Sequence, residues 1–182
     1  MSFYQDGNFY HVYNRGCNRN DIFFHQRNYK YLINLFLNNS KKHKIDLTAF
    51  CLMPNHYHLL LKQDLNGSIS NFLKSTFTSY TLAINKEQKR SGTLFEGKPK
   101  KKLIDKIQYI QYVIWYIHRN PVNAGIVSFP EEWQFSNYLE FIGKRKRYFT
   151  DVDLIVDLYG SQKGYEMFMQ KFEDDKRFDL EL

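Results

Sequence analysis

The sequence predicts an α+β domain in which strands and helices follow one another in the order βαββαβ, with further helices after them. Three observations support this class. Segments with strand-like alternation or short apolar runs are separated by segments with apolar residues at helical spacing. Hydrophobic residues make up 43% of the 182 residues and aromatic residues 18%, so the chain can bury a sizeable core. The order βαββαβ is that of a ferredoxin-like sheet with two helices on one face.

The first three strands and the first helix are predicted from local pattern. Asn8–Tyr13 alternates and is rich in strand-forming residues, and the loop after it is rich in Asn and Gly. Asn28–Lys42 is predicted as a helix because its apolar residues recur at helical spacing, at Tyr31, Leu32, Leu35 and Phe36. Lys44–Leu52 and His56–Lys62 are predicted as paired strands that are joined by a turn at Pro54 and Asn55.

The second half of the predicted sheet begins after a loop. Ser68 is expected to cap a long helix over Ile69–Lys89, which Ser91 and Gly92 end. Leu94–Ile104 holds a fourth strand that is interrupted by Gly97 and Pro99. Short helices are expected near Asn137–Ile142 and Ser161–Phe172. We expect residues 1–121 to form the main domain and residues 122–182 to form an extension that packs on it.

A further helix is predicted over Lys106–Arg119, with Pro121 stopping it. Four isoleucines form its buried stripe, at Ile107, Ile110, Ile114 and Ile117. Tyr109, Tyr112, Tyr116 and Asn120 lie on another face, away from this stripe. Tyr109 and Tyr112 are expected to pack against a second helix or strand. Such packing is less expected for Tyr116. Tyr116 and Asn120 place a phenol and an amide oxygen about 6 Å apart along the helix.

Charge and composition narrow the class of partner. Lys and Arg number 26 against 19 acidic residues, a formal net charge of +7, which favours an anionic partner, either nucleic acid or a membrane surface. The positive charges form separate clusters at Lys41, Lys42 and Lys44, at Lys86, Lys89 and Arg90, at Lys98 and Lys100–Lys102, and at Lys144–Arg147. No apolar segment is long enough to span a membrane, and no secretion signal is visible. We therefore expect a cytoplasmic protein with Cys17 and Cys51 as reduced thiols, the latter in the core.

His56 and His58 are two residues apart on a predicted strand, so their side chains point to the same face. Two imidazoles on one rigid face can hold a divalent cation. Two hydrogen-bonded histidines on a half-exposed strand are the alternative interpretation. The two histidines alone do not decide between these interpretations.

Five motifs in order resemble the HUH-type single-tyrosine transposases, and most closely the REP-associated tyrosine transposases. The first two are residues 10–16, Tyr-His-Val-Tyr-Asn-Arg-Gly, and residues 53–60, Met-Pro-Asn-His-Tyr-His-Leu-Leu. The third is residues 92–100, Gly-Thr-Leu-Phe-Glu-Gly-Lys-Pro-Lys. The last two are residues 116–125, Tyr-Ile-His-Arg-Asn-Pro-Val-Asn-Ala-Gly, and residues 133–138, Trp-Gln-Phe-Ser-Asn-Tyr. The resemblance covers nearly the whole chain.

The resemblance implies a transposase that cleaves and rejoins single-stranded DNA at a hairpin or foldback through a 5′-phosphotyrosine intermediate. It implies Tyr116 as the nucleophile, because the family's tyrosine stands four residues before the Asn of an Asn-Pro pair. His56, His58 and Asn120 would then hold Mg²⁺ or Mn²⁺. Arg15 and Arg19, together with Lys98, Lys100, Lys101 and Lys102, are candidate DNA contacts, although charged residues in loops are often only solvated. The protein would act as a monomer or a homodimer and would associate with the nucleoid.

The sequence leaves two further points open. No base for the phenol is evident: His11 and His118 are candidates, but a packing or surface role is the favoured interpretation for each. The competing function is a non-catalytic single-strand nucleic-acid-binding protein on the same fold, whose aromatic residues would stack on bases. Within the transposases, the extension after residue 121 favours action on REP-like palindromes over mobilisation of the protein's own element.

Overall fold

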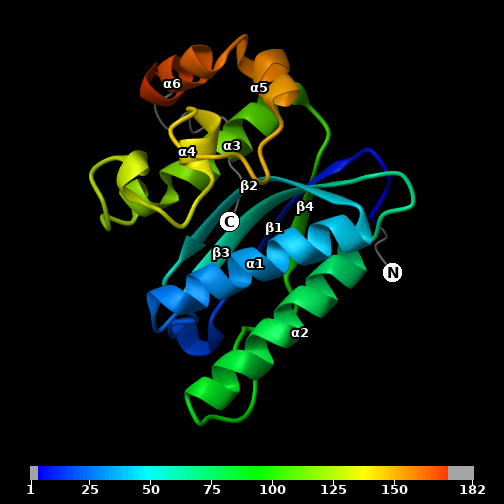
Figure 1. Ribbon diagram of the computed structural model, residues 1–182, viewed down its shortest axis with the longest axis vertical. Coiled ribbons are helices and arrows are strands. Elements are labelled where there is room, and N and C mark those ends of the chain that lie inside the picture. Colours follow the sequence, from blue (N-terminus) through cyan, green and yellow to red (C-terminus); the bar gives the residue numbers. More distant parts are fainter. Residues whose placement is uncertain (1–3, 172–182) are drawn as a thin grey trace.

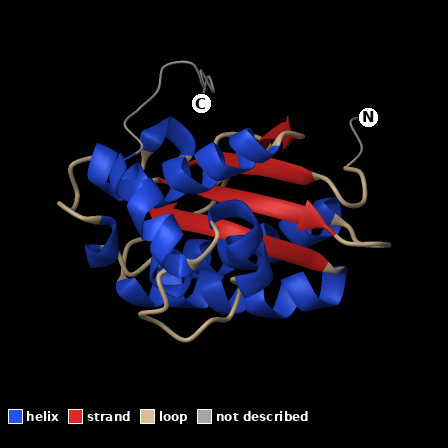
Figure 2. Ribbon diagram, turned by 90° about the horizontal axis from the view of Figure 1, so that it is seen from above, coloured by secondary structure: helices blue, strands red, loops and turns tan. Residues whose placement is uncertain are grey.

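The computed structural model describes residues 4–171, whose centre is one antiparallel sheet with strand order β2-β3-β1-β4. The strands are β1 (Phe9–Arg15), β2 (Ile45–Met53), β3 (His56–Gln63) and β4 (Lys100–Ile104). This strand order and the sequence of elements confirm the predicted ferredoxin-like fold (Figures 1 and 2). The fourth strand is shorter than predicted, because Gly97 has a φ of +70° and Pro99 has no N–H to donate to the sheet.

Helices cover both faces of the sheet, as Figure 1 shows. The long helices α1 (Gln26–His43) and α2 (Ile69–Glu87) pack on one face, and Ser68 caps α2 as predicted by accepting a hydrogen bond from the Asn71 N–H. Helix α3 (Ile107–Asn123) packs on the opposite face, chiefly against β2. The short helices on the same side as α3 are α4 (Tyr138–Phe141), α5 (Val152–Tyr159) and α6 (Gln162–Lys171). Of these, α5 was not predicted. Phe172, the last residue of the predicted terminal helix, lies outside the described residues.

Two short 3₁₀ turns, η1 (Cys17–Arg19) and η2 (Pro130–Glu132), lie in the loops. Cys51 is buried in the core, as predicted, and both cysteines are free thiols. No helix within residues 4–171 has the length and apolar character needed to cross a membrane.

Two details of α3 differ from the prediction. The prediction that Pro121 stops the helix was wrong: α3 continues to Asn123, because proline removes only one N–H donor and the Ala124 N–H still bonds to the Asn120 carbonyl. Ile107 is 62% exposed, since it begins the helix and the later turns make the contact with the sheet. Ile110, Ile114 and Ile117 are buried as predicted.

Strand alternation divides the side chains of β1 and β3 between the two faces of the sheet. On β3, Tyr57, Leu59 and Leu61 belong to the core under α1 and α2. His58 and Leu60 alternate with them, and Leu60 packs in the core under α3. The face that carries the histidines is therefore the face that α3 crosses.

The segment after η2 covers the outer edge of β2. The Leu52 N–H donates to the Phe135 carbonyl at 2.9 Å, and the Asn137 N–H donates to the Phe50 carbonyl at 3.3 Å. Cys51 and Ser136 form an isolated antiparallel bridge between these bonds. An open sheet edge is a site for unwanted pairing, so this segment both protects β2 and ties the extension to the sheet.

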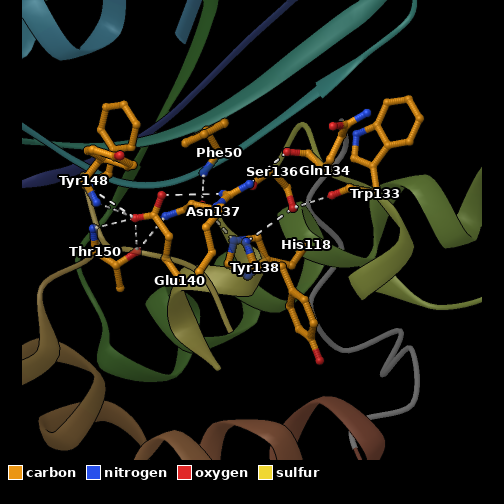
Figure 3. Close-up of polar contacts among 12 residues, drawn as sticks. Phe50, His118, Trp133, Gln134, Ser136, Asn137, Tyr138, Glu140, Tyr148 and Thr150 are labelled. Carbon is orange, nitrogen blue, oxygen red and sulfur yellow. Dashed lines mark hydrogen bonds and ion pairs between the residues drawn. The ribbon is translucent and has the colours of Figure 1, made fainter. Parts of the chain in front are cut away.

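A buried polar network centred on Asn137 joins the extension to β2 and α3 (Figure 3). The Asn137 side-chain oxygen accepts from the Phe50 N–H at 2.8 Å and lies 2.9 Å from His118 Nε2. The Asn137 amide donates to the Thr48 carbonyl at 2.9 Å and to Thr150 Oγ1 at 3.2 Å. His118 Nε2 must be the donor to Asn137, so His118 Nδ1 accepts from the Tyr165 hydroxyl, 2.6 Å away.

Glu140 holds the loop that follows α4 against the same network. Its carboxylate is 1% exposed and accepts hydrogen bonds from the N–H groups of Tyr148, Phe149 and Thr150 at 3.1 to 3.3 Å. Backbone amides thus satisfy a buried carboxylate, which would otherwise be costly.

We predict that Asn137→Ala lowers the free energy of unfolding by about 3 kcal/mol, because it leaves several buried donors and acceptors without partners. Urea denaturation followed by circular dichroism measures this change. Asn34→Ala, on the exposed side of α1, is the control and should leave stability unchanged or slightly raised. Equal stability of the Asn137 and Asn34 variants would contradict the role of the network.

Candidate active site

His56 and His58 lie on the face of β3 that α3 crosses, as their spacing predicts. His56 begins the strand directly after the turn at Pro54 and Asn55, and it is partly exposed. His58 is 5% exposed and sits deeper in the sheet. Their ring centroids are 5.2 Å apart at an interplanar angle of 86°.

Each of these histidines has its Nδ1 atom engaged by a neighbouring side chain. His56 Nδ1 lies 2.7 Å from the Asn55 side-chain oxygen, and His58 Nδ1 lies 3.1 Å from His11 Nε2. The nitrogen that remains on each ring for a ligand is therefore Nε2. His56 Nε2 lies 3.2 Å from Asn120 Oδ1, so a ring nitrogen and an amide oxygen already converge.

Helix α3 places Tyr116 and Asn120 over the two histidines. The Tyr116 ring stands edge-on to His58, with centroids 5.3 Å apart and an interplanar angle of 88°. Asn120 follows one turn later and is 7% exposed. All four side chains come from a single chain.

The other tyrosines of α3 lie outside this arrangement. Tyr112 is 5% exposed and stacks on Trp115 in the core, as its packing interpretation predicted. Tyr109 is 37% exposed at the start of the helix, so it does not pack as fully as expected.

A pocket of about 430 Å³ opens in front of the histidines and Tyr116. Its rim carries Arg15, Arg19, Lys100 and Glu96. Arg15 forms a two-point ion pair with Glu96, which raises the pKa of Arg15 and lowers the pKa of Glu96. Both groups are solvent-exposed, so the pair holds the arginine in place more than it stabilises the fold.

The predicted lysine contacts divide between the two faces of the sheet. Lys100 lies beside Tyr13 at the rim of the pocket, and Lys102 pairs in register with His11. Lys98 and Lys101 instead line a groove of about 1080 Å³ between α2 and the loop before β4. Only Arg15, Arg19 and Lys100 of the predicted DNA contacts therefore line the candidate active-site pocket.

Burial keeps the imidazoles of this site neutral. It lowers the pKa of His58 well below the ordinary value, and the neighbouring His11 and His56 add to the effect. Burial also lowers the pKa of His56, although the hydrogen bond to Asn120 opposes this. The pKa of His11 falls to about 3 through burial and the nearby charge of Lys102. Neutral imidazole is the form that binds metal ions.

The donor set fits an open site for a divalent cation. Two imidazole nitrogens and one amide oxygen are available, and no group of three or more His, Cys, Asp or Glu side chains forms a metal site within residues 4–171. A closed zinc site would need four protein ligands, which this set does not supply. Mg²⁺ and Mn²⁺ accept a neutral oxygen together with oxygens from water or phosphate, so these ions suit the set better.

Three residues around the site were not assigned these roles from the sequence. Asn55 and His11 contact the two histidines, and Glu96 holds Arg15. His11 had a usable signal, because the order βαββαβ places the first strand beside the third and alternation puts His11 on the histidine face. His118, the other candidate base, faces Asn137 and Tyr165 in the interior and is 0% exposed.

Comparison with known proteins gives one matching family model and solved structures with a similar fold. A family model described as "Transposase IS200 like" matches residues 5–120. No curated protein gives a significant match. The solved structure of a REP-associated tyrosine transposase bound to a REP hairpin has a TM-score of 0.69 and 16% identity, and the match covers 83% of this chain and 89% of that chain. At this identity the likeness concerns the fold alone.

A second solved structure is that of a protein from Deinococcus radiodurans which is provisionally assigned as a transposase. It has a TM-score of 0.45 and 16% identity, and the match covers 62% of this chain and 90% of that chain.

We predict that stability falls as the pH drops from about 6.5 toward 4. The pKa of His118 is lowered from 6.5 to about 4 by burial. Between pH 6.5 and pH 4 the unfolded chain therefore binds a proton at His118 that the folded chain does not bind. By pH 4 this difference lowers the free energy of unfolding by about 3 kcal/mol. Urea unfolding at a series of pH values measures the slope. His118→Gln should flatten it, and His43→Gln, at a partly exposed position, should change it much less. Equal slopes in wild type and His118→Gln would contradict the assignment.

Proposed function

This chain belongs to the IS200-like transposase family, and on that premise we propose that it is a metal-dependent single-strand DNA endonuclease and strand transferase. Membership of the family implies cleavage and rejoining of DNA. The finer proposal concerns the mechanism: Tyr116 is the nucleophile, and His56, His58 and Asn120 hold the cation. We further propose that the site acts in cis, within one chain.

One observation carries this proposal: Tyr116 of α3 contacts His58 of β3, and Asn120 contacts His56, beside a pocket that Arg15, Arg19 and Lys100 also line. A non-catalytic nucleic-acid-binding protein has no use for a phenol, two neutral imidazoles and an amide at one point. A phosphoryl-transfer site uses each of them.

In the proposed reaction, the phenol of Tyr116 loses its proton to water, and its oxygen attacks the scissile phosphorus. The bond from phosphorus to the 3′ oxygen breaks, and that oxygen takes up a proton to leave a free 3′ hydroxyl. The other product is a 5′-phosphotyrosine. One phosphodiester bond replaces another, so the step reverses without ATP when a 3′ hydroxyl attacks.

The residues around Tyr116 have separate tasks. When bound, Mg²⁺ or Mn²⁺ supplies Lewis-acid chemistry at the scissile phosphate. His56, His58 and Asn120 hold that cation in place on two rigid elements. Arg15, Arg19 and Lys100 at the rim bind the flanking phosphates, because guanidinium and ammonium groups pair with phosphate oxygens. Lys98, Lys101 and Lys102 stay predicted DNA contacts away from the scissile bond.

We propose hairpin or foldback DNA of the REP type as the substrate. The REP-associated structure is bound to a REP hairpin, and its likeness covers 83% of this chain, which is more than residues 5–120 alone. The shared fold thus extends into the segment after α3 that the shorter family model leaves out.

We predict that wild type forms a covalent adduct with a labelled single-stranded oligonucleotide that carries a hairpin, in the presence of Mn²⁺ or Mg²⁺. Tyr116→Phe should bind the oligonucleotide and form no adduct, because it lacks the nucleophilic oxygen. Denaturing gel electrophoresis detects the adduct, and Tyr112→Phe is the matched control that should retain it. Loss of the adduct in Tyr112→Phe with retention in Tyr116→Phe would reverse the nucleophile assignment. Binding without an adduct in wild type would favour the non-catalytic function.

We also predict that a chelator stops cleavage and that added Mn²⁺ restores it. His56→Ala and His58→Ala should each slow adduct formation on the order of 10²–10⁴-fold, since a metal ion contributes several kcal/mol of transition-state stabilisation. His43→Ala, on α1, is the histidine control and should react at the wild-type rate. Cleavage that continues at full rate in the presence of a chelator would remove the metal from the proposal.

A further inference from the structure

His11 is a buried histidine that contacts one of the two proposed metal ligands. It comes from β1, the sheet neighbour of β3, and it is 0% exposed. Its Nε2 atom lies 3.1 Å from His58 Nδ1, and the two rings are nearly parallel, with centroids 5.2 Å apart and an interplanar angle of 22°. The other nitrogen of His11, Nδ1, is buried and has no hydrogen-bond partner.

A hydrogen bond between two imidazole nitrogens needs a proton on one nitrogen and a lone pair on the other. Two neutral rings allow this in two ways. If His58 holds a cation through Nε2, its single proton must be on Nδ1. His58 then donates to His11, and His11 must offer a lone pair at Nε2 and carry its own proton on Nδ1.

We propose that His11 is a positioning residue for the metal site: its Nε2 accepts a hydrogen bond from the Nδ1–H of His58, which keeps the proton of His58 on Nδ1 and leaves the Nε2 lone pair of His58 for the cation. This inference rests on the proposed function. Asn55 has the corresponding position at the other ligand, with its side-chain oxygen 2.7 Å from His56 Nδ1. Outer partners of this kind fix both the tautomer and the orientation of metal-bound histidines.

The surroundings of His11 favour a neutral imidazole, which keeps a lone pair for the hydrogen bond from His58. Burial disfavours a positive charge on His11, and Lys102, its partner in register on β4, adds to this effect. Tyr13 lies 5.2 Å from His11 and 5.7 Å from His58 between ring centroids, so it holds both rings in place from the side.

The unpartnered Nδ1 atom of His11 affects which tautomer the metal-free protein adopts. A buried N–H without an acceptor is unfavourable, so the metal-free protein should favour the tautomer in which His11 Nε2–H donates to His58 Nδ1. Cation binding then changes the tautomer of both rings. His58 loses its Nε2 proton and gains one at Nδ1, while His11 loses its Nε2 proton and gains one at Nδ1, so the number of protons on the pair does not change.

The direct test is the affinity for Mn²⁺ alone, measured by electron paramagnetic resonance in wild type and three variants. His11→Leu removes the acceptor at similar volume and should weaken Mn²⁺ binding by about 10–100-fold. His11→Gln places an amide oxygen near the former Nε2 and should stay within a few-fold of wild type. His43→Gln, on α1, is the control with unchanged affinity. Thermal melts establish that each variant is folded.

Nuclear magnetic resonance of wild type with labelled histidines supplies a second readout that does not depend on any variant. In saturating Mg²⁺, long-range nitrogen–proton couplings should show His58 protonated at Nδ1 and His11 protonated at Nδ1. Without a metal ion, both rings should be protonated at Nε2. His11 protonated at Nε2 in the Mg²⁺-bound protein would overturn the inference, as would equal Mn²⁺ affinity in wild type and a folded His11→Leu.

The outcomes separate this inference from the function on which it rests. A wild type that binds no Mn²⁺ at His56 and His58 removes the proposed metal site, and the role of His11 with it. If wild type binds Mn²⁺ but His11→Gln loses as much affinity as His11→Leu, the metal site stands and the role of His11 as a hydrogen-bond acceptor is contradicted. The imidazole ring would then contribute through its packing. If His11→Leu does not fold, the comparison of His11→Gln with wild type and the tautomers in wild type decide the question.

Discussion

The rotation of α3 about its axis decides whether Tyr116 and Asn120 meet the histidines of β3. Each residue turns a helix by about 100°, so an error of one position would carry Tyr116 away from the histidines. His118 fixes this rotation: it lies in the interior between Asn137 and Tyr165, two residues from Tyr116 and two from Asn120. Because Asn137 is also bonded to β2, the segment after α3 helps to set the geometry of the candidate site, although none of its described residues lines the pocket.

The electrostatics of the site follow from where each charge lies. The interior holds neutral imidazoles whose pKa values burial has lowered, and the rim holds Arg15, Arg19 and Lys100. Neutral nitrogen donors at the base of a pocket attract a cation, and positive side chains at its mouth attract phosphate. The pocket is thus suited to a phosphodiester that meets a cation on one side and arginine on the other.

The sequence predicted the parts of this arrangement that depend on local pattern. Two-residue spacing placed His56 and His58 on one face, and the order of the elements predicted the strand order. Local pattern missed what depends on contacts between distant segments. Helix α3 continues through Pro121 because its packing outweighs one lost hydrogen bond, and the register of β1 against β3 and β4 gives His11 and the lysines their places. The predicted lysine cluster straddles the sheet edge, so alternation sends Lys101 away from the face that carries Lys100.

In the proposed site, one chain places a phenol beside a cation held by two histidines and an asparagine. Anomalous X-ray diffraction from crystals of Tyr116→Phe grown with Mn²⁺ and a hairpin oligonucleotide would locate this cation. We expect one manganese peak in contact with His56 Nε2, His58 Nε2 and Asn120 Oδ1, with a phosphate oxygen completing the site beside residue 116 of the same chain. A manganese peak elsewhere, or DNA whose phosphates lie far from residue 116, would contradict it.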